Sequence, residues 1–488
     1  MSAPAGWEAV IGLEIHVQLG TRTKMFCRCE NVPGGEPNTR ICPVCTAQPG
    51  ALPVPNGAAV EKAILVGLAL GSRIAERSLF YRKNYFYPDS PKAYQISQYD
   101  EPLCVGGELR LPTADGDEVV QFVRVHLEED AAKTIHEGGG GGRLAGSTGS
   151  VVDFNRCGTP LIEMVTEPCL HDASAAARFG RALKATIEAL GVSDCDMEKG
   201  SLRMDANVSV RRAGETELRT KSELKNMNSF SYLERGIERE IARQVELYES
   251  GGRVVSHTLH YDPARDELTE LRSKEEVADY RYFPEPDLVP MAPAAALIAS
   301  LRASMPELPA ARIRRFESEH GLPFRQAADL NASPALASYF EQVAEAAGDS
   351  RAAANWVLND LARHLNEHGL AAADAPVAPG ALAALIGLVG EGVVGSAAAR
   401  EVFAALAAGD GDDPRRIVEE RGLGQIADSN ALAALVDEVI AAHPQQAEQY
   451  RAGKDALAGF FVGQVMKRSG GRAEPRAVQS LLRARLRD

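Results

Sequence analysis

The sequence has no apolar run long enough to cross a lipid bilayer. Its longest uninterrupted apolar stretch is residues 380–390, well short of the roughly 18–20 residues that a membrane-spanning helix needs. The N-terminus also lacks a basic segment, and its apolar stretch is broken by Glu14, His16 and Gln18, which is not the pattern of a secretory signal. We therefore expect a protein without a membrane span that is located in the cytoplasm.

Two common nucleotide-binding motifs are also missing. The sequence contains no phosphate loop of the type G-x-x-x-x-G-K-[ST], and no G-x-G-x-x-G follows an expected strand and opens a helix. It has no internal repeat either. Any nucleotide site must therefore be built from other residues.

Charge is unevenly distributed along the chain. The formal net charge is −14, yet the last 38 residues, 451–488, carry nine Lys/Arg against three Asp/Glu. That segment has a net charge of +6, so the other 450 residues sum to −20. A basic segment on an acidic protein is the candidate contact for a nucleic acid.

Length and periodicity predict an α+β protein with three parts. A chain of 488 residues exceeds a single core and suggests roughly three domains. Residues 1–292 are rich in period-two stretches and turn residues, which predicts a mostly antiparallel β domain with a few helices. Residues 293–408 are rich in alanine, leucine and arginine with helical periodicity. The acidic segment 409–414 is interpreted as a linker that opens a small, basic helical tail, 409–488.

Four segments of the first part are clear enough to assign. Apolar residues alternate with polar ones in 13–19 and again in 202–210, so each is expected to be a strand with one polar face. Between 229 and 252 the apolar residues recur every three or four positions and end at a glycine pair, which predicts an amphipathic helix. The glycine run 138–142 is expected to be a flexible loop insertion.

Four of the eight cysteines fall within nineteen residues. They form two close pairs, Cys27 with Cys29 and Cys42 with Cys45, and thiolates at this spacing suit a tetrahedral structural Zn²⁺. The first pair is C-x-C rather than C-x-x-C, so incidental buried or redox-active thiols are the alternative. The isolated cysteines are interpreted as core residues: Cys104, Cys157, Cys169 and Cys195.

Titratable residues on two expected strands could bind a cation. Glu14 and His16 project from one face, as two ligands of one ion would, although a plain solvated sheet face gives the same pattern. In the segment 124–130, Arg124, His126 and Glu128 share one face, and three carboxylates crowd the strand end. A hard cation such as Mg²⁺ would relieve their repulsion, and exposure to solvent would do so equally well.

The segment 82–95 mixes cations with aromatic residues. Arg82, Lys83, Tyr85 and Lys92 are its candidates for holding phosphates and stacking a base, as ATP would require. The alternative is an aromatic-rich loop that packs on the sheet.

Seven blocks of the first part closely resemble the B subunit of the tRNA-dependent GatCAB amidotransferase. A weaker resemblance continues in the tail, at 454–467 (KDALAGFFVGQVMK). The blocks are 7–19 (WEAVIGLEIHVQL), 82–100 (RKNYFYPDSPKAYQISQYD), 126–136 (HLEEDAAKTIH), 152–166 (VDFNRCGTPLIEMVT), 201–210 (SLRMDANVSV), 223–230 (ELKNMNSF) and 279–290 (DYRYFPEPDLVP).

The resemblance implies a cradle-shaped catalytic domain, a helical domain, and a small tail that reaches the elbow of tRNA. It further implies a Mg²⁺ site made of Glu14, His16, Glu129 and Glu163, where alternation alone leaves Glu128 and Glu129 undecided. The four clustered cysteines correspond to the zinc site of some family members. The sequence has no room for the inserted domain of the related archaeal subunit, which favours the bacterial form.

The activity implied by the resemblance is the amidation of mischarged tRNA. ATP would phosphorylate the side-chain carboxylate of Glu-tRNA(Gln) or Asp-tRNA(Asn), and ammonia would then displace phosphate. No serine- or cysteine-centred motif here resembles an amidase, so an A subunit would release the ammonia from glutamine, with a small C subunit to stabilise the pair.

Two rival functions remain open on the sequence alone. A non-catalytic, zinc-stabilised tRNA-binding scaffold would turn over no ATP. A stand-alone metal-dependent hydrolase would be active without tRNA or partner subunits.

Overall fold

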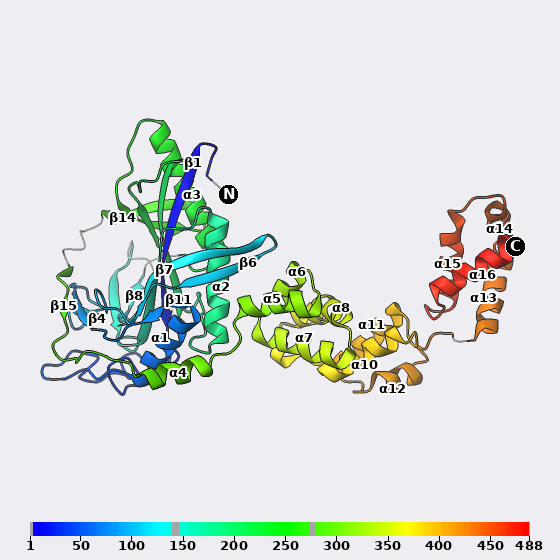
Figure 1. Cartoon of the computed structure of the whole chain (residues 1–488), viewed down its shortest axis with the longest axis horizontal. Helices are drawn as coiled ribbons and strands as arrows, with labels where there is room; N and C mark the ends of the chain where they lie inside the picture. Colours follow the sequence, from blue (N-terminus) through cyan, green and yellow to red (C-terminus); the bar gives the residue numbers. More distant parts are fainter. Residues whose placement is uncertain (1–2, 139–145, 226, 274–279, 427, 488) are drawn as a thin grey trace. The chain divides into compact units, whose positions relative to one another are not determined.

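The chain folds into two compact units, Met1–Arg312 and Ile313–Asp488 (Figure 1). The computed structural model describes residues 3–138, 146–225, 227–273, 280–426 and 428–487. The predicted glycine loop at 138–142 lies outside the described residues except for its first position. No helix in these described ranges is long and apolar enough to span a membrane.

The first unit is built on a ten-stranded sheet. Its strand order is β14-β13-β12-β11-β1-β10-β7-β5-β2, with β6 paired to β7. All neighbours run antiparallel except β12 and β13. The strands are β1 (Trp7–Gln18), β2 (Arg73–Ile74), β5 (Cys104–Val105), β6 (Glu108–Thr113), β7 (Gly116–Glu129), β10 (Pro160–Thr166), β11 (Leu202–Arg212), β12 (Ser222–Lys225), β13 (His257–Asp262) and β14 (Glu267–Ser273).

Among the described residues, two smaller sheets and the helices α1 to α4 complete this unit. One small sheet has the order β15-β3-β4 and the other pairs β8 with β9. Their strands are β3 (Tyr81–Asn84), β4 (Tyr94–Ser97), β8 (Lys133–Glu137), β9 (Gly149–Asp153) and β15 (Phe283–Pro284). The helices are α1 (Gly57–Ala69), α2 (Ala173–Ala189), α3 (Phe230–Glu249) and α4 (Ala295–Ala303).

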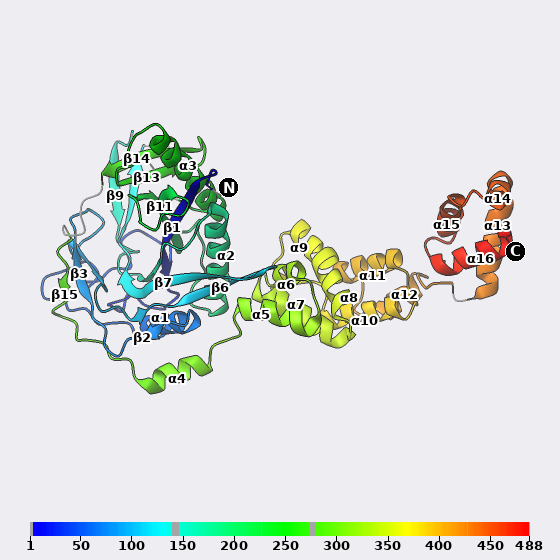
Figure 2. The same cartoon turned by 45° about the horizontal axis from the view of Figure 1, so that its top comes forward.

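Helices α2 and α3 cover one face of the large sheet (Figures 1 and 2). The alternation in β1 explains this, because Ile11, Leu13 and Ile15 all point to that face and are at most 1% exposed. They share one hydrophobic core with Phe179 of α2 and Ile237 of α3. The polar residues of β1 are left on the opposite face, where the site is built.

The two covering helices have the local signals that start and stop a helix. The Asp172 side chain accepts a hydrogen bond from Ala175 N at the start of α2, and Ser229 caps α3 in the same way. Helix α3 ends before Gly251, whose φ of +81° favours glycine. The predicted amphipathic helix and glycine stop are both confirmed.

The second unit is helical, and its described residues form two separate hydrophobic clusters. The helices that build the first cluster are α5 (Pro309–His320), α6 (Phe324–Leu330), α7 (Pro334–Ala347), α8 (Ser350–Asn355), a π-helical turn (Trp356–Leu361), α9 (Ala362–His368), a short 3₁₀ turn (Ala372–Asp374), α10 (Pro379–Gly390), α11 (Ser396–Ala408) and α12 (Pro414–Glu420). The helices that build the second are α13 (Ser429–Ala442), α14 (Pro444–Arg451), α15 (Leu457–Arg468) and α16 (Pro475–Arg487).

The α+β class is confirmed, and the divisions between parts lie later in the chain than the sequence indicates. The first unit ends at Arg312 rather than near 292, because Leu297 and Leu301 of α4 pack against its core. Likewise Ile417 and Val418 of α12 belong to the first helical cluster. The hydrophobic cluster of the basic tail begins at Leu432, after α12.

Candidate catalytic and metal sites

Three neighbouring strands bring acids and imidazoles into one row on the polar face of the sheet. In the antiparallel register, His16 of β1 lies opposite Glu163 of β10, and Glu163 lies opposite His126 of β7. Directly opposed side chains on one face of a sheet have Cβ atoms about 5 Å apart. His16 is thus brought into contact with Glu163, which lies 147 positions later in the sequence.

His16 is the centre of the cluster. Its Nε2 lies 3.4 Å from Glu163 Oε2, 3.6 Å from Glu14 Oε1 and 3.7 Å from Glu128 Oε1. His126 Nε2 is 3.6 Å from the same Glu163 oxygen. One ligand atom from each of Glu14, His16 and Glu163, and likewise from His126, Glu128 and Glu163, lies within 4.8 Å of the others. We call these five residues the acid–imidazole cluster.

Burial and mutual charge shift the pKa values of these groups strongly. Burial alone would lower the pKa of His16, but its neighbouring carboxylates raise the pKa to about 9. Burial raises the pKa of Glu128 to about 7 and lowers that of His126 to about 4. Burial would raise the pKa of Glu163, but His126 and His16 hold it well below its ordinary value. The imidazolium of His16 therefore balances the acids, and a cation bound there would compete with its proton.

A cavity of about 310 Å³ opens beside the cluster. Its wall carries three cationic side chains, Lys83, Arg124 and Lys225, and two stacked tyrosine rings, Tyr99 and Tyr282, whose centroids are 4.3 Å apart. The full lining is Glu14, Lys83, Ser97, Gln98, Tyr99, Arg124, His126, Glu163, Glu223, Lys225, Thr258, Tyr280 and Tyr282. The cavity therefore combines groups for a cation, for phosphates and for a flat ring.

The structure places Glu129 outside the acid–imidazole cluster, although the resemblance implies it as a ligand. Successive residues of β7 point to opposite sides, so Glu128 faces His16 and Glu129 does not. The Glu129 carboxylate forms an ion pair with Lys92 and accepts a hydrogen bond from Ile96 N at 3.1 Å. Glu128 instead accepts from Ser97 Oγ at 3.2 Å, on the side of the cluster.

Of the four residues expected to hold phosphates, only Lys83 lines the cavity. Arg82 makes a two-point ion pair with Glu285, with both N–O distances 2.7 Å, and stacks on Tyr94. Lys92 forms an ion pair with Glu129. Tyr85 lines a separate small cavity with Lys92, so the structure places these three residues outside the cavity beside the cluster.

Arg124 and Lys225 line the cavity, but the sequence did not identify either of them as a residue of the site. The alternation of 124–130 did place Arg124 beside His126, and Arg124 Nη2 lies 3.9 Å from Glu163 Oε1. Lys225 had no comparable signal, because β12 is only four residues long. It reaches the site through strand pairing, and its Nζ lies 2.6 Å from Asp205 Oδ2.

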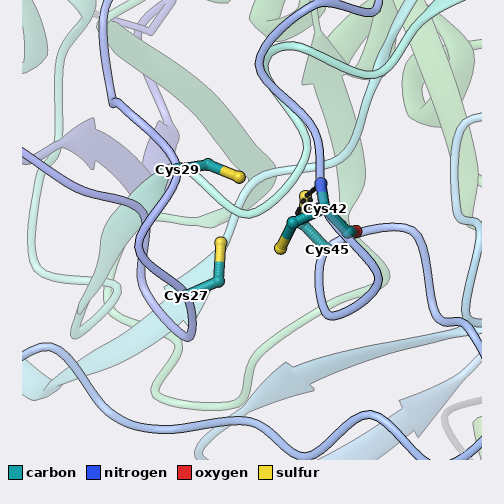
Figure 3. Close-up of side chains that lie close together, drawn as sticks. All are labelled: Cys27, Cys29, Cys42 and Cys45. Carbon is teal, nitrogen blue, oxygen red and sulfur yellow. Dashed lines mark hydrogen bonds between the residues drawn. The ribbon is translucent and has the colours of Figure 1, made fainter.

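The four clustered cysteines converge as their spacing predicts. Their sulfur atoms all lie within 4.8 Å of one another, and none is part of a disulfide. Figure 3 shows the side chains of Cys27 and Cys29 pointing toward those of Cys42 and Cys45. A hydrogen bond from Cys27, a backbone hydrogen bond from Cys42 and the nearby Lys24 ammonium lower the pKa of Cys45 to about 5. We call this group the cysteine cluster.

The other cysteines do not join the cluster. Cys104, Cys157 and Cys195 are buried, as expected for core residues, and Cys169 is half-buried.

Comparison with known proteins places the chain in a family. Residues 9–299 match the GatB/GatE catalytic domain, and residues 338–486 match the GatB domain. The B subunit of the aspartyl/glutamyl-tRNA(Asn/Gln) amidotransferase of Halorhodospira halophila is 49% identical over 482 residues, or 98% of this chain and 99% of that protein. The chain belongs to this B-subunit family.

Other members of the family are similarly close. The protein from Bordetella avium is 48% identical over 98% of this chain and 99% of its own length, and the one from Moorella thermoacetica is 48% identical over 98% and 100%. The resemblance drawn from the sequence blocks is confirmed. The acid–imidazole cluster and the cysteine cluster both lie within the matched catalytic domain of the family.

Proposed function

We propose that this B-family chain uses ATP to phosphorylate the side-chain carboxylate of glutamate or aspartate on mischarged tRNA, which ammonia then converts to the amide. The names of its relatives state tRNA(Asn/Gln) amidotransferase. One observation carries the chemistry: three members of the acid–imidazole cluster, Glu14, His126 and Glu163, line the same cavity as three cationic side chains. A carboxylate would lose oxide if ammonia attacked it directly, so it must first gain a better leaving group.

The residues fit a hard divalent cation. Three carboxylates, Glu14, Glu128 and Glu163, crowd one imidazole, and oxygen-rich sets of this kind suit Mg²⁺. The Nδ1 atom of buried His126 has no hydrogen-bond partner among the described residues, which is an unsatisfied polar atom at the edge of the set. We propose that Glu14, His16, Glu128 and Glu163 hold the ion. When bound, Mg²⁺ would neutralise charge on the transferring phosphoryl group.

The chain's cations would then position the phosphates. Lys83 and Arg124 line the cavity next to Glu163, where they can attract the polyphosphate and the tRNA-linked carboxylate together. In the first step an oxygen of that carboxylate bonds to the γ-phosphorus, and the bond from that phosphorus to the bridging oxygen of ADP breaks. In the second step ammonia bonds to the acyl carbon, phosphate leaves, and the amide nitrogen loses a proton.

The proposal requires partner subunits. We propose that an A subunit hydrolyses glutamine to supply the ammonia and that a C subunit completes a heterotrimer. Because charged tRNA is consumed at ribosomes, the complex would act in the cytoplasm.

Comparing two neighbouring glutamates tests the proposed ligand set. Glu128→Gln is expected to lower the rate of ATP-dependent phosphorylation of mischarged tRNA by about 100-fold, because it removes charge from the cation site. Glu129→Gln should have a smaller effect, since Glu129 pairs with Lys92 outside the cluster. Single-turnover assays of the reconstituted complex with radiolabelled ATP measure both. If Glu129→Gln lowered the phosphorylation rate more than Glu128→Gln, Glu129 would belong to the ligand set.

We further propose that the cysteine cluster binds a structural Zn²⁺. Four sulfur donors within 4.8 Å of one another suit a soft, tetrahedral metal and not a hard one.

Cys42→Ser is expected to remove the zinc and to lower the melting temperature, because a metal bound only to the folded state stabilises that state. Calorimetry with elemental analysis measures both effects. Cys169→Ser is the control, since Cys169 lies outside the cluster. If Cys42→Ser kept a full equivalent of zinc, the assigned ligands would be wrong.

A further inference from the structure

Lys24 is a fully buried cation beside the cysteine cluster. Its exposed fraction is 0%, although lysine is almost never fully buried unless its charge is paired. Its Nζ donates to Cys45 Sγ at 3.7 Å and to the carbonyl oxygen of Phe154 at 3.4 Å. Within the described ranges of the chain, no carboxylate forms an ion pair with it. The position therefore needs negative charge from another source.

The cysteine cluster can provide that charge, and it provides the most with a metal bound. Without a metal, the single thiolate of Cys45 would be the one anionic sulfur beside the buried ammonium of Lys24. Four thiolates around one divalent ion carry a net charge of −2, and the nearest of them would belong to Cys45. The charges of lysine and metal centre thus complement each other.

We propose that Lys24 is the counter-cation of the metal centre and donates its hydrogen bond to the Cys45 thiolate. The inference rests on the proposed zinc site and is independent of the phosphorylation chemistry. Lys24 is a positioning residue, because it acts on the metal through Cys45. Outer-shell partners of this kind typically change metal affinity by about 10–100-fold.

Further hydrogen bonds attach the metal centre to the loop before β10. Cys157 Sγ donates to the Cys45 carbonyl at 3.2 Å, and Met25 N donates to the Gly158 carbonyl at 2.7 Å. A Cβ atom at Gly158 would lie 3.5 Å from both Cys45 Cβ and Lys24 Cδ, so the backbone passes close under this pair. Through its hydrogen bond to the Phe154 carbonyl, Lys24 links the centre to this loop, which leads to Glu163 on β10.

Lys24→Met tests the role, because it keeps most of the length and the apolar character of the side-chain stem but removes the charge. Zinc transfer from the purified complex to a chromogenic chelator should give an affinity 10–100-fold weaker than that of the unchanged protein. Lys24→Gln keeps an N–H donor but not the charge. Its zinc affinity should lie between those of Lys24→Met and the unchanged protein. Lys62→Met is the matched control, because Lys62 Nζ donates a hydrogen bond to the Gly191 carbonyl and not to a cysteine. The zinc affinity of this variant should equal that of the unchanged protein.

Cobalt substitution separates a role at the metal from a general loss of packing. The sulfur-to-Co²⁺ charge-transfer band should move to lower energy in Lys24→Met, because losing a hydrogen bond raises the energy of the thiolate lone pair. An unaltered band together with unaltered zinc affinity would overturn the proposal for Lys24 alone. If the unchanged protein bound neither zinc nor cobalt, the zinc site itself would be refuted, and the Lys24 role with it.

Discussion

Glu163→Gln is expected to lower the rate of ATP-dependent phosphorylation of mischarged tRNA by about 100- to 1,000-fold. Glu163 touches both imidazoles of the cluster, with its Oε2 3.4 Å from His16 Nε2 and 3.6 Å from His126 Nε2. The substitution removes a negative charge while keeping the shape of the side chain. Single-turnover formation of phosphorylated aminoacyl-tRNA, followed with radiolabelled ATP, measures the loss.

The loss should be confined to the phosphorylation step. Hydrolysis of glutamine by the partner subunit should persist, because the cluster belongs to this chain. Glu167→Gln is a suitable control, since Glu167 follows the same strand but is exposed. An unchanged phosphorylation rate in Glu163→Gln would remove the cluster from catalysis. It would leave the non-catalytic tRNA-binding scaffold as the better description of the chain.

The second large effect is expected from the basic tail. Ending the chain after Gln425 should weaken the binding of mischarged tRNA and reduce its dependence on salt concentration. The cationic residues of the tail are well placed to bind phosphates, because they lie on its exposed surface. They are Arg451, Lys454, Lys467, Arg468, Arg472, Arg476, Arg483 and Arg485. Each phosphate that is no longer bound removes roughly 0.7–0.9 from the slope of log affinity against log salt.

The fold dictates where to cut the tail. Removing everything from Asp410 would also delete α12, whose Ile417 and Val418 fill the core of the preceding helices. A cut after Gln425 keeps that core and removes the cluster that begins at Leu432.

A triple substitution of the tail provides a second, milder test. Arg468→Gln, Arg476→Gln and Arg483→Gln together should lower the salt slope by up to about 3, roughly one for each phosphate that these arginines bind. Filter binding at several salt concentrations measures the slope. A slope equal to that of the full chain in both variants would exclude the tail from tRNA recognition, whereas glutamine hydrolysis by the partner should be unaffected in either case.

Local patterns were sufficient for much of the fold. The alternation in β1 correctly predicted its polar face, and the three- and four-residue spacing before Gly251 correctly predicted α3. The cysteine cluster was equally accessible, because its four members lie within nineteen residues and a short chain segment can bring them together.

The cation site was harder to predict from the sequence, because its residues come from different strands. Period two indicated that His126 and Glu128 share a face, and it did not show which other strands lie next to β7. The match to sequence blocks suggested Glu129, yet the pleat of β7 turns that carboxylate toward Lys92. Arg82 illustrates the same limit, since its partner Glu285 is about two hundred positions away in the sequence.

The sequence by itself determined the α+β class, the family, the cysteine cluster and the basic end of the chain, because each depends on composition or on residues close together. Only the tertiary structure decided which acids meet His16, which cations line the cavity, and that a lysine is buried next to Cys45. Those relations depend on strand order and register, which bring distant residues together. The local sequence around a residue does not reveal which distant residue its side chain will contact.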